Sequence, residues 1–170
     1  KWNTTEIDPE TMQRIERHRA MRADKGFDTV ECYRHVEHIV AKRQDVLLLE
    51  CMSNLLANEM YLEPDSDDGG LAETMSEVEK TGVGMSETLS PVSKKIVQAL
   101  VNLSTRVQDV VIVTNDVFSD GGSLTYDEST REYVKNLAEI NCALAREAAT
   151  VTEVVCGIPV IVKKNHPMGK

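Results

Sequence analysis

Two short, wholly apolar runs constrain the fold most strongly. Val46-Leu47-Leu48-Leu49 runs into Glu50, and Val110-Val111-Ile112-Val113 runs into Thr114-Asn115-Asp116. A short run of consecutive apolar residues is typical of a strand buried on both faces, as in a parallel sheet that helices cover. Because such strands alternate here with helical patterns, the sequence predicts an α/β fold with a mainly parallel sheet flanked by helices.

The other elements are predicted from apolar spacing and from end signals. Helices are expected over roughly 33–43, Met52–Tyr61, Pro91 to about Arg106 and 128–149, and short strands over 27–32 and within 152–163, bent at 157–159. Residues 62–90 carry eight acidic residues and four glycines against one lysine, which predicts an exposed, mobile insertion. We therefore expect a single α/β domain over 1–164, with this insertion at 62–90 and a tail at 165–170.

The totals exclude several classes of protein. The chain has 170 residues with 19 Lys+Arg against 28 Asp+Glu, a formal net charge of −9, which argues against nucleic acid or an acidic membrane as the main partner. No run approaches the roughly 18 apolar residues that would predict a membrane span. The four cysteines show no CxxC spacing and no signal peptide precedes them, so reduced thiols and a cytoplasmic location are expected.

A basic stripe with a histidine at its centre is the sharpest chemical feature. Residues 14–22 read Arg-Ile-Glu-Arg-His-Arg-Ala-Met-Arg and follow Asp8-Pro9-Glu10, which suits the start of a helix. Positions four apart place Arg14, His18 and Arg22 on one line. The cations favour a neutral, nucleophilic imidazole and can bind an anion beside it. A histidine that attacks phosphorus is one hypothesis, and a solvated basic helix is the other.

Acidic and amide side chains follow the predicted strands. Glu31, Glu50 and residues 114–116 would lie along the carboxyl edge of a parallel sheet, where open α/β folds bind their ligands. A carboxylate that ends an apolar strand holds a metal ion in P-loop nucleotide enzymes, although it can also merely cap the next helix. Both interpretations of Glu50 stay open. His35 and His38 are three apart, but no acid or cysteine completes a metal-ligand set.

The motifs occur in an order that resembles one family. They are Arg-Ile-x-x-His-Arg-x-x-Arg at 14–22, Thr-Val-Glu at 29–31, Leu-Leu-Leu-Glu-Cys-Met-Ser-Asn-Leu-Leu-Ala-Asn-Glu at 47–59, Val-Val-Ile-Val-Thr-Asn-Asp-Val at 110–117, Asn141 and Gly-Ile-Pro at 157–159. Over nearly all of residues 8–164, apart from the acidic insertion, the chain resembles the bifunctional adenosylcobinamide kinase/adenosylcobinamide-phosphate guanylyltransferase of cobalamin biosynthesis.

The resemblance implies a RecA-like P-loop NTPase fold, usually a homotrimer, and an enzyme with two reactions. The aminopropanol hydroxyl of adenosylcobinamide is phosphorylated, and GMP from GTP is then transferred onto that phosphate. In the family GMP is held covalently on a histidine, which matches His18. The implied nucleotide-binding residues are Arg19, Ala20, Met21, Arg22, Glu31 and Glu50. GTP or ATP is the implied nucleotide, with Mg²⁺ at Glu50.

The chain departs from the family pattern in two places. The Gly-rich GxxxxGKS loop and the first strand are absent from these 170 residues, so we expect them about thirty residues before Lys1. Asp116 replaces the usual Glu, and residues 118–122 differ from the usual glycine-rich sequence, so no role is assigned there. Two alternatives stay open. One is another P-loop small-molecule kinase, and the other is a non-catalytic nucleotide- or corrinoid-binding protein that has lost its P-loop.

Overall fold

A computed structural model describes residues 12–13, 16–17, 20, 25–62, 89–117 and 126–165. The chain divides into two compact units, Lys1–Glu31 and Cys32–Lys170, and each is described by itself. Nearly all of the predicted acidic insertion and most of the predicted tail lie outside the described residues. The expectation of one domain over 1–164 stays a prediction.

The first unit agrees with the sequence in one segment and differs in another. The described residues between 12 and 20 are all helical, as predicted, whereas His18 itself lies outside the described residues. Residues 27–31 form no strand, so the strand predicted over 27–32 is wrong. Phe27 and Val30 alternate with polar residues but are both exposed. Alternation indicates a strand only where a neighbouring strand pairs with the segment, and no described strand pairs with residues 27–31.

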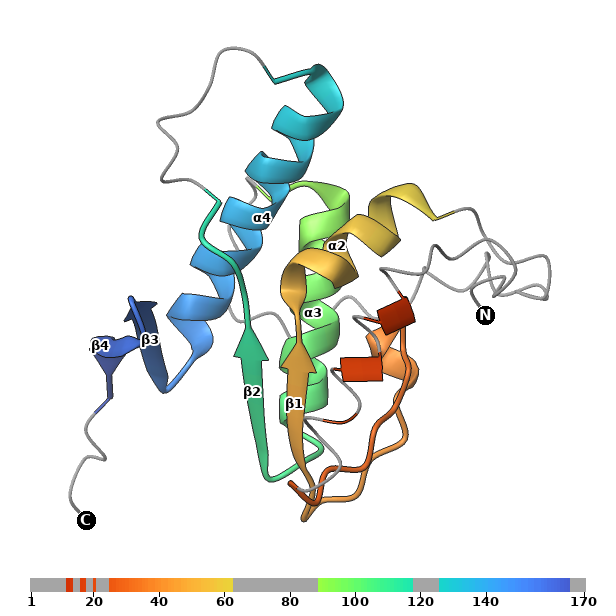
Figure 1. The fold of residues 1–170 in the computed structure, drawn as a ribbon, viewed down its shortest axis with the longest axis vertical. Helices are drawn as coiled ribbons and strands as arrows, with labels where there is room; N and C mark the ends of the chain where they lie inside the picture. The colour runs from red at the N-terminus through yellow and green to blue at the C-terminus, as the bar shows by residue number, and fades with distance from the viewer. Residues whose placement is uncertain are drawn as a thin grey trace. The chain divides into compact units, whose positions relative to one another are not determined.

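The second unit contains the parallel sheet that the sequence predicts. Strands β1 (Val46–Glu50) and β2 (Asp109–Val113) pair in parallel, from Val46 opposite Asp109 to Glu50 opposite Val113, so both strands end level (Figure 1). The chain between them passes through helices α2 (Met52–Tyr61) and α3 (Pro91–Ser104), and α4 (Glu128–Glu147) follows β2. The α/β class with a parallel sheet and flanking helices is confirmed.

The start of two of these helices follows directly from local sequence. The Ser90 hydroxyl accepts a hydrogen bond from the Ser93 amide (3.2 Å), and Pro91 occupies the first turn of α3. The Asp127 carboxylate accepts one from the Thr130 amide (2.7 Å) at the start of α4. These side chains satisfy amides that a helix leaves without an internal partner. No helix in the described part of the chain combines the length and apolarity needed to cross a bilayer.

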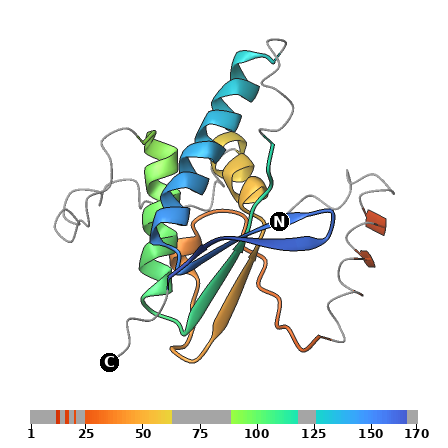
Figure 2. The ribbon, with the colours of Figure 1, turned by 90° about the vertical axis from the view of Figure 1, so that its left-hand side faces the viewer.

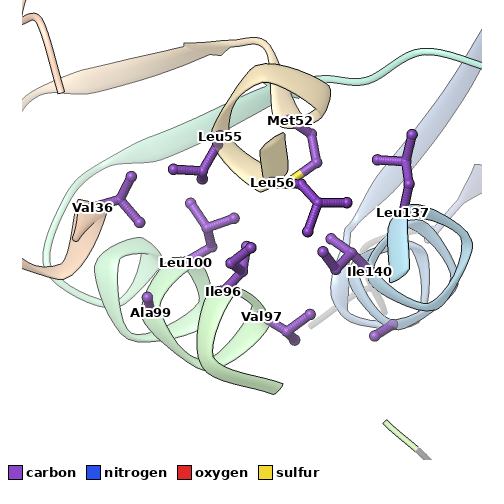
Figure 3. Close-up of a cluster of buried hydrophobic side chains, with 11 residues drawn as sticks. Val36, Met52, Leu55, Leu56, Ile96, Val97, Ala99, Leu100, Leu137 and Ile140 are labelled. Carbon is purple, nitrogen blue, oxygen red and sulfur yellow. The ribbon is translucent and has the colours of Figure 1, made fainter. Parts of the chain in front are cut away.

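The core of the second unit lies where the three helices meet one face of the sheet (Figure 3). Its buried side chains are Met52, Leu55 and Leu56 of α2, Ile96, Val97, Ala99 and Leu100 of α3, Leu137, Ile140 and Ala143 of α4, and Val36. Leu49 and Ile112 pack against this cluster from the sheet. Their neighbours along the strands, Leu48, Val111 and Val113, are exposed. The prediction that both strands are buried on both faces is therefore wrong for the described residues, because helices cover one face only.

The helix predicted over 33–43 is also wrong. This segment forms only one 3₁₀ turn, η1 (Val36–His38), which His35 precedes in the left-handed conformation (φ 56°, ψ 49°). Ile39 after the turn is extended (φ −60°, ψ 124°). A left-handed residue cannot continue a right-handed helix, so the local backbone ends the pattern on both sides.

The chain closes with the two strands predicted near its end. β3 (Thr150–Val155) and β4 (Ile158–Lys164) form an antiparallel hairpin whose turn, Cys156–Gly157, has positive φ at both residues. Figure 2 shows the hairpin leaving the C-terminal end of α4. There the Lys163 ammonium donates to the carbonyls of Ala145 (3.0 Å) and Arg146 (2.7 Å), which places a cation at the negative end of the helix.

Candidate active site

The carboxyl edge of the parallel sheet brings together the polar residues that follow both strands. Glu50 is the last residue of β1, is exposed, and stands opposite Val113 of β2. β2 ends at Val113, opposite Glu50, and the chain continues through Thr114-Asn115-Asp116. These residues therefore begin directly after the position that pairs with Glu50. The predicted convergence of Glu50 with residues 114–116 is therefore present, which is the geometry at which open α/β sheets bind ligands.

A hydrogen-bond network centred on Ser53 joins this edge. Ser53 lies in the first turn of α2 and is only 8% exposed. Its hydroxyl contacts the Cys51 sulfur (2.9 Å) and accepts a bond from the Asn115 side-chain amide (3.2 Å). Its carbonyl accepts a bond from the Tyr133 hydroxyl of α4 (3.1 Å), and burial raises the pKa of that phenol. The ends of β1 and β2 and the helix α4 are thus tied to one serine.

A second contact fixes the segment after β2 from the other side. The Thr114 hydroxyl donates to the side-chain carbonyl of Asn141 in α4 (2.8 Å). Two successive residues, Thr114 and Asn115, are therefore bound to α4 and α2 respectively. In the described part of the chain, the Glu50 carboxylate forms no hydrogen bond or ion pair of its own. The edge thus combines a held amide segment with a carboxylate that can take up a ligand.

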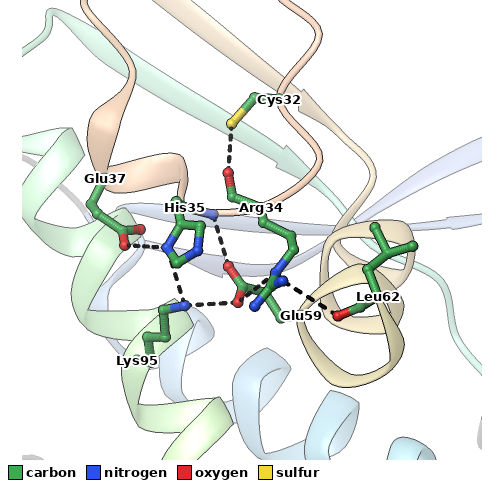
Figure 4. Close-up of polar contacts among 7 residues, drawn as sticks. All are labelled: Cys32, Arg34, His35, Glu37, Glu59, Leu62 and Lys95. Carbon is green, nitrogen blue, oxygen red and sulfur yellow. Dashed lines mark hydrogen bonds and ion pairs between the residues drawn. The ribbon is translucent and has the colours of Figure 1, made fainter. Parts of the chain in front are cut away.

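A separate polar cluster surrounds Glu59 near the C-terminal end of α2 (Figure 4). The Glu59 side chain is only 4% exposed and accepts bonds from the Lys95 ammonium (2.7 Å) and the His35 amide (2.8 Å). Burial alone would raise the pKa of this carboxyl, but the bonds from Lys95 and His35 more than offset that effect and hold its pKa below the ordinary value. Arg34 adds a longer ion pair at 3.7 Å. The cluster fixes η1 against α2 and α3.

The groups next to this cluster include two histidines and a thiol. The rings of His35 and His38 stack with centroids 5.6 Å apart, so the two histidines are neighbours as predicted. Across the described residues, no three His, Cys, Asp or Glu side chains gather closely enough to hold a metal ion. Burial, together with the charges of Glu37 and Glu59, raises the pKa of the Cys32 thiol and disfavours its nucleophilic form.

The predicted site residues divide between what the structure describes and what it does not. His18, Arg19, Met21 and Arg22 lie outside the described residues, and Ala20 is a helical position. Glu31 is exposed in the irregular end of the first unit, and Glu50 stands at the sheet edge of the second.

Sequence reasoning missed the role of Ser53. One signal could have found it, because positions 53, 56 and 60 recur at helical spacing and so place this serine on the apolar side of α2. A serine on a core stripe requires polar partners, since a buried hydroxyl without a hydrogen bond is destabilising. Those partners, at 51 and 115, stand at the ends of the two strands.

The comparison with known families agrees with the motifs. The family model described as "Cobinamide kinase / cobinamide phosphate guanyltransferase" matches residues 3–162, which covers the described sheet edge and the sequence around His18. No curated protein matches the chain closely enough to count as a relative. On the strength of the family match, the chain belongs to the cobinamide kinase/cobinamide phosphate guanyltransferase family of cobalamin biosynthesis, a family of enzymes that act on cobinamide and nucleotides.

Proposed function

We propose that this protein is an adenosylcobinamide kinase and adenosylcobinamide-phosphate guanylyltransferase that passes GMP through a guanylyl-histidine at His18. The observation that carries the proposal is the family match over residues 3–162, which includes both the stripe of Arg14, His18 and Arg22 and the strand-ending Glu50. The parallel sheet with flanking helices is compatible with the RecA-like P-loop fold that this function implies. A cytoplasmic location is part of the same proposal.

The guanylyl transfer proceeds in two displacement steps at the same phosphorus. A ring nitrogen of His18 attacks the α-phosphorus of GTP, so that an N–P bond forms and the bond to pyrophosphate breaks. A phosphate oxygen of adenosylcobinamide phosphate then attacks the same phosphorus, and the imidazole leaves. Arg19 and Arg22 stabilise the charge that gathers on the phosphate oxygens in both steps. Ala20, Met21 and Glu31 complete the proposed nucleotide contacts.

Glu50 fits the proposed magnesium site. Mg²⁺ prefers oxygen ligands and is usually held by one or two carboxylates, with the remaining positions taken by water and substrate phosphates. An exposed carboxylate at the carboxyl edge of the sheet, without another protein partner among the described residues, meets that requirement. When bound, the ion would neutralise charge on the phosphates of GTP or ATP.

A homotrimer completes the proposal. The resemblance implies it, and the hairpin supports it because Val154, Ile158 and Ile161 are all more than half exposed. Val154 and Ile161 lie on one face of the hairpin and Ile158 on the other, so both faces offer apolar surface that a partner chain would cover.

Labelling with α-phosphate-labelled GTP tests the guanylyl-histidine. The native full-length protein should retain GMP through a bond that is labile in acid and comparatively stable in alkali, and His18→Asn should abolish the label. Asparagine keeps a hydrogen bond at a similar reach but has no basic lone pair to attack phosphorus. Phosphorylation of adenosylcobinamide should persist in this variant, because the substrate hydroxyl attacks the γ-phosphate directly.

The matched control is His38→Asn, which changes an exposed histidine outside the basic stripe and should keep the label. An acid-labile GMP on the His18→Asn protein would place the nucleophile elsewhere. Absence of any label on the unmodified protein, together with intact phosphorylation, would favour an ordinary small-molecule kinase. Absence of both activities would favour a non-catalytic binding protein.

A further inference from the structure

Ser53 does more than fill the start of α2, because its hydroxyl stands between the ends of both parallel strands. A hydroxyl has one proton and two lone pairs. Since it accepts from the Asn115 amide at 3.2 Å, its own proton is available for the Cys51 sulfur at 2.9 Å. Cys51 directly follows Glu50. One relay of hydrogen bonds therefore connects the Cys51 side chain, next to Glu50 in the sequence, with the side chain of Asn115.

The relay fixes the orientation of an exposed group. Asn115 is exposed and its carboxamide is planar, so holding the nitrogen end also holds the oxygen end. The neighbouring Thr114 is bound to Asn141 at 2.8 Å, which prevents the backbone of this segment from swinging away from α4. The Asn115 carboxamide oxygen is thus held two residues beyond Val113, which pairs with Glu50, and can accept a hydrogen bond from a hydroxyl or amine of a bound substrate.

We propose that Ser53 is a positioning residue for the reactions of the proposed function. It acts through Asn115, which contacts the substrate. This inference rests on the proposed function. Ser53 touches no substrate in this arrangement, since it is 8% exposed beneath the edge. Its part is to remove the rotational freedom of the Asn115 side chain before the substrate binds.

The consequences of removing the hydroxyl can be separated from those of lost stability. In Ser53→Ala the Asn115 amide turns to water at no large penalty, because it is already exposed. We expect the melting temperature to fall by no more than about 2–4 °C, the shift that corresponds to roughly one net hydrogen bond in a chain of this size. The turnover number should fall about tenfold, which corresponds to the loss of one oriented neutral contact.

A double-mutant cycle in the native full-length protein tests the route. If Ser53 acts through Asn115, Ser53→Ala should lower kcat about tenfold in the wild-type background but less than about twofold in an Asn115→Ala background. Ser53→Thr keeps the hydroxyl and should recover most of the activity. Ser104→Ala is the matched control, because it removes a serine hydroxyl at the C-terminal end of α3. That hydroxyl donates to the Val101 carbonyl, so its loss should leave kcat unchanged.

A second measurement reads the contact without activity. In NMR spectra, the two side-chain amide protons of Asn115 should be dispersed and slow to exchange in the wild-type protein. In Ser53→Ala they should move toward solvent-exposed values. Additive effects of the two substitutions on kcat, or an Asn115 amide that Ser53→Ala does not change, would overturn the inference. If the unmodified protein catalyses neither transfer, the proposed function fails, and the NMR result still decides whether Ser53 holds Asn115.

Discussion

At the residue scale, Glu59 is a nearly buried carboxylate that cationic and amide groups surround. Its side chain is 4% exposed, yet it is charged, and its pKa is held below the ordinary value mainly by the Lys95 ammonium and the His35 amide against the opposing effect of burial. The contrast is the exposed pair of Arg131 and Glu128 at 3.5 Å, of a kind that contributes little in water. Lys95 is 36% exposed, so solvent screens part of its attraction to Glu59. The contribution of this cluster to the free energy of unfolding is therefore moderate, and it depends on pH.

A lowered pKa predicts the direction of that dependence. A carboxyl whose folded-state pKa is depressed contributes stability that is fully present above the unfolded value, about 4.5, and is lost as the pH falls through the folded value. Glu59→Gln should lower the free energy of unfolding by about 1–3 kcal/mol at pH 7, because it removes charge-assisted bonds from a buried site. It should also flatten the loss of stability below pH 5.

Urea unfolding at pH 7, 5, 4 and 3 measures both effects. Glu128→Gln provides the control, since it neutralises the carboxylate of an exposed pair and should change stability by less than about 0.5 kcal/mol. Equal stability of wild type and Glu59→Gln at pH 7, or parallel curves below pH 5, would mean that this carboxyl contributes nothing specific.

What the sequence can reveal at this scale depends on the separation of the partners. Glu50 was identifiable because it ends an apolar strand, a pattern contained in five residues. The contacts of Ser53 with Asn115 and of Glu59 with Lys95 join residues 62 and 36 positions apart. No local pattern encodes such pairs, because they exist only after α2, α3 and β2 have packed. The position of Glu50 at the edge was therefore predictable, but the contacts that hold the neighbouring residues were not.

At the scale of elements, side-chain caps mark the start of two correctly predicted helices, whereas α2 forms without one. The helix α3 begins at Pro91 and α4 at Glu128, where Ser90 and Asp127 cap their first turns. The segments 27–32 and 33–43 carry a weak alternation and a weak helical spacing without such caps, and neither forms the predicted element. Periodicity alone is a weak signal, because tertiary contacts decide whether a periodic segment forms the helix or strand that it predicts.

The cap of α3 permits a direct test. Ser90→Ala removes the acceptor of the Ser93 amide and should destabilise the protein by about 1 kcal/mol, and the melting temperature should fall by about 2–4 °C. The Ser90 amide would still donate to Glu139 (2.9 Å), so the backbone should hold its place. Ser90→Asp retains an acceptor and should preserve most of the stability. Thermal unfolding followed by circular dichroism distinguishes them, and equal melting of Ser90→Ala and wild type would show that Pro91 alone determines the start of the helix.

At the scale of the whole molecule, two apolar surfaces of the second unit stand exposed among the described residues. One is the sheet face formed by Leu48, Val111 and Val113, and the other is the hairpin. The sequence predicted apolar strands correctly but could not show which faces the chain itself covers. That depends on how many layers pack together, which an apolar run does not encode. Of the two surfaces, the hairpin indicates association more strongly, because residues on both of its faces are apolar.

The hairpin therefore predicts how the protein assembles. Val160 and Ile161 are adjacent in β4, so they point to opposite faces, and both are exposed. A two-stranded hairpin is at best marginally stable alone in water, so association that covers its faces would stabilise it. If the hairpin lies in the proposed trimer interface, light scattering should give three times the mass of one chain, and Ile161→Lys should shift the mass toward that of one chain. A lysine there would place an unpaired charge in an apolar contact.

Val40→Lys, at a side chain 97% exposed outside the hairpin, is the matched control and should leave the mass unchanged. A trimer that survives Ile161→Lys would exclude this hairpin from the interface, and a single-chain mass for the wild-type protein would contradict the trimer itself.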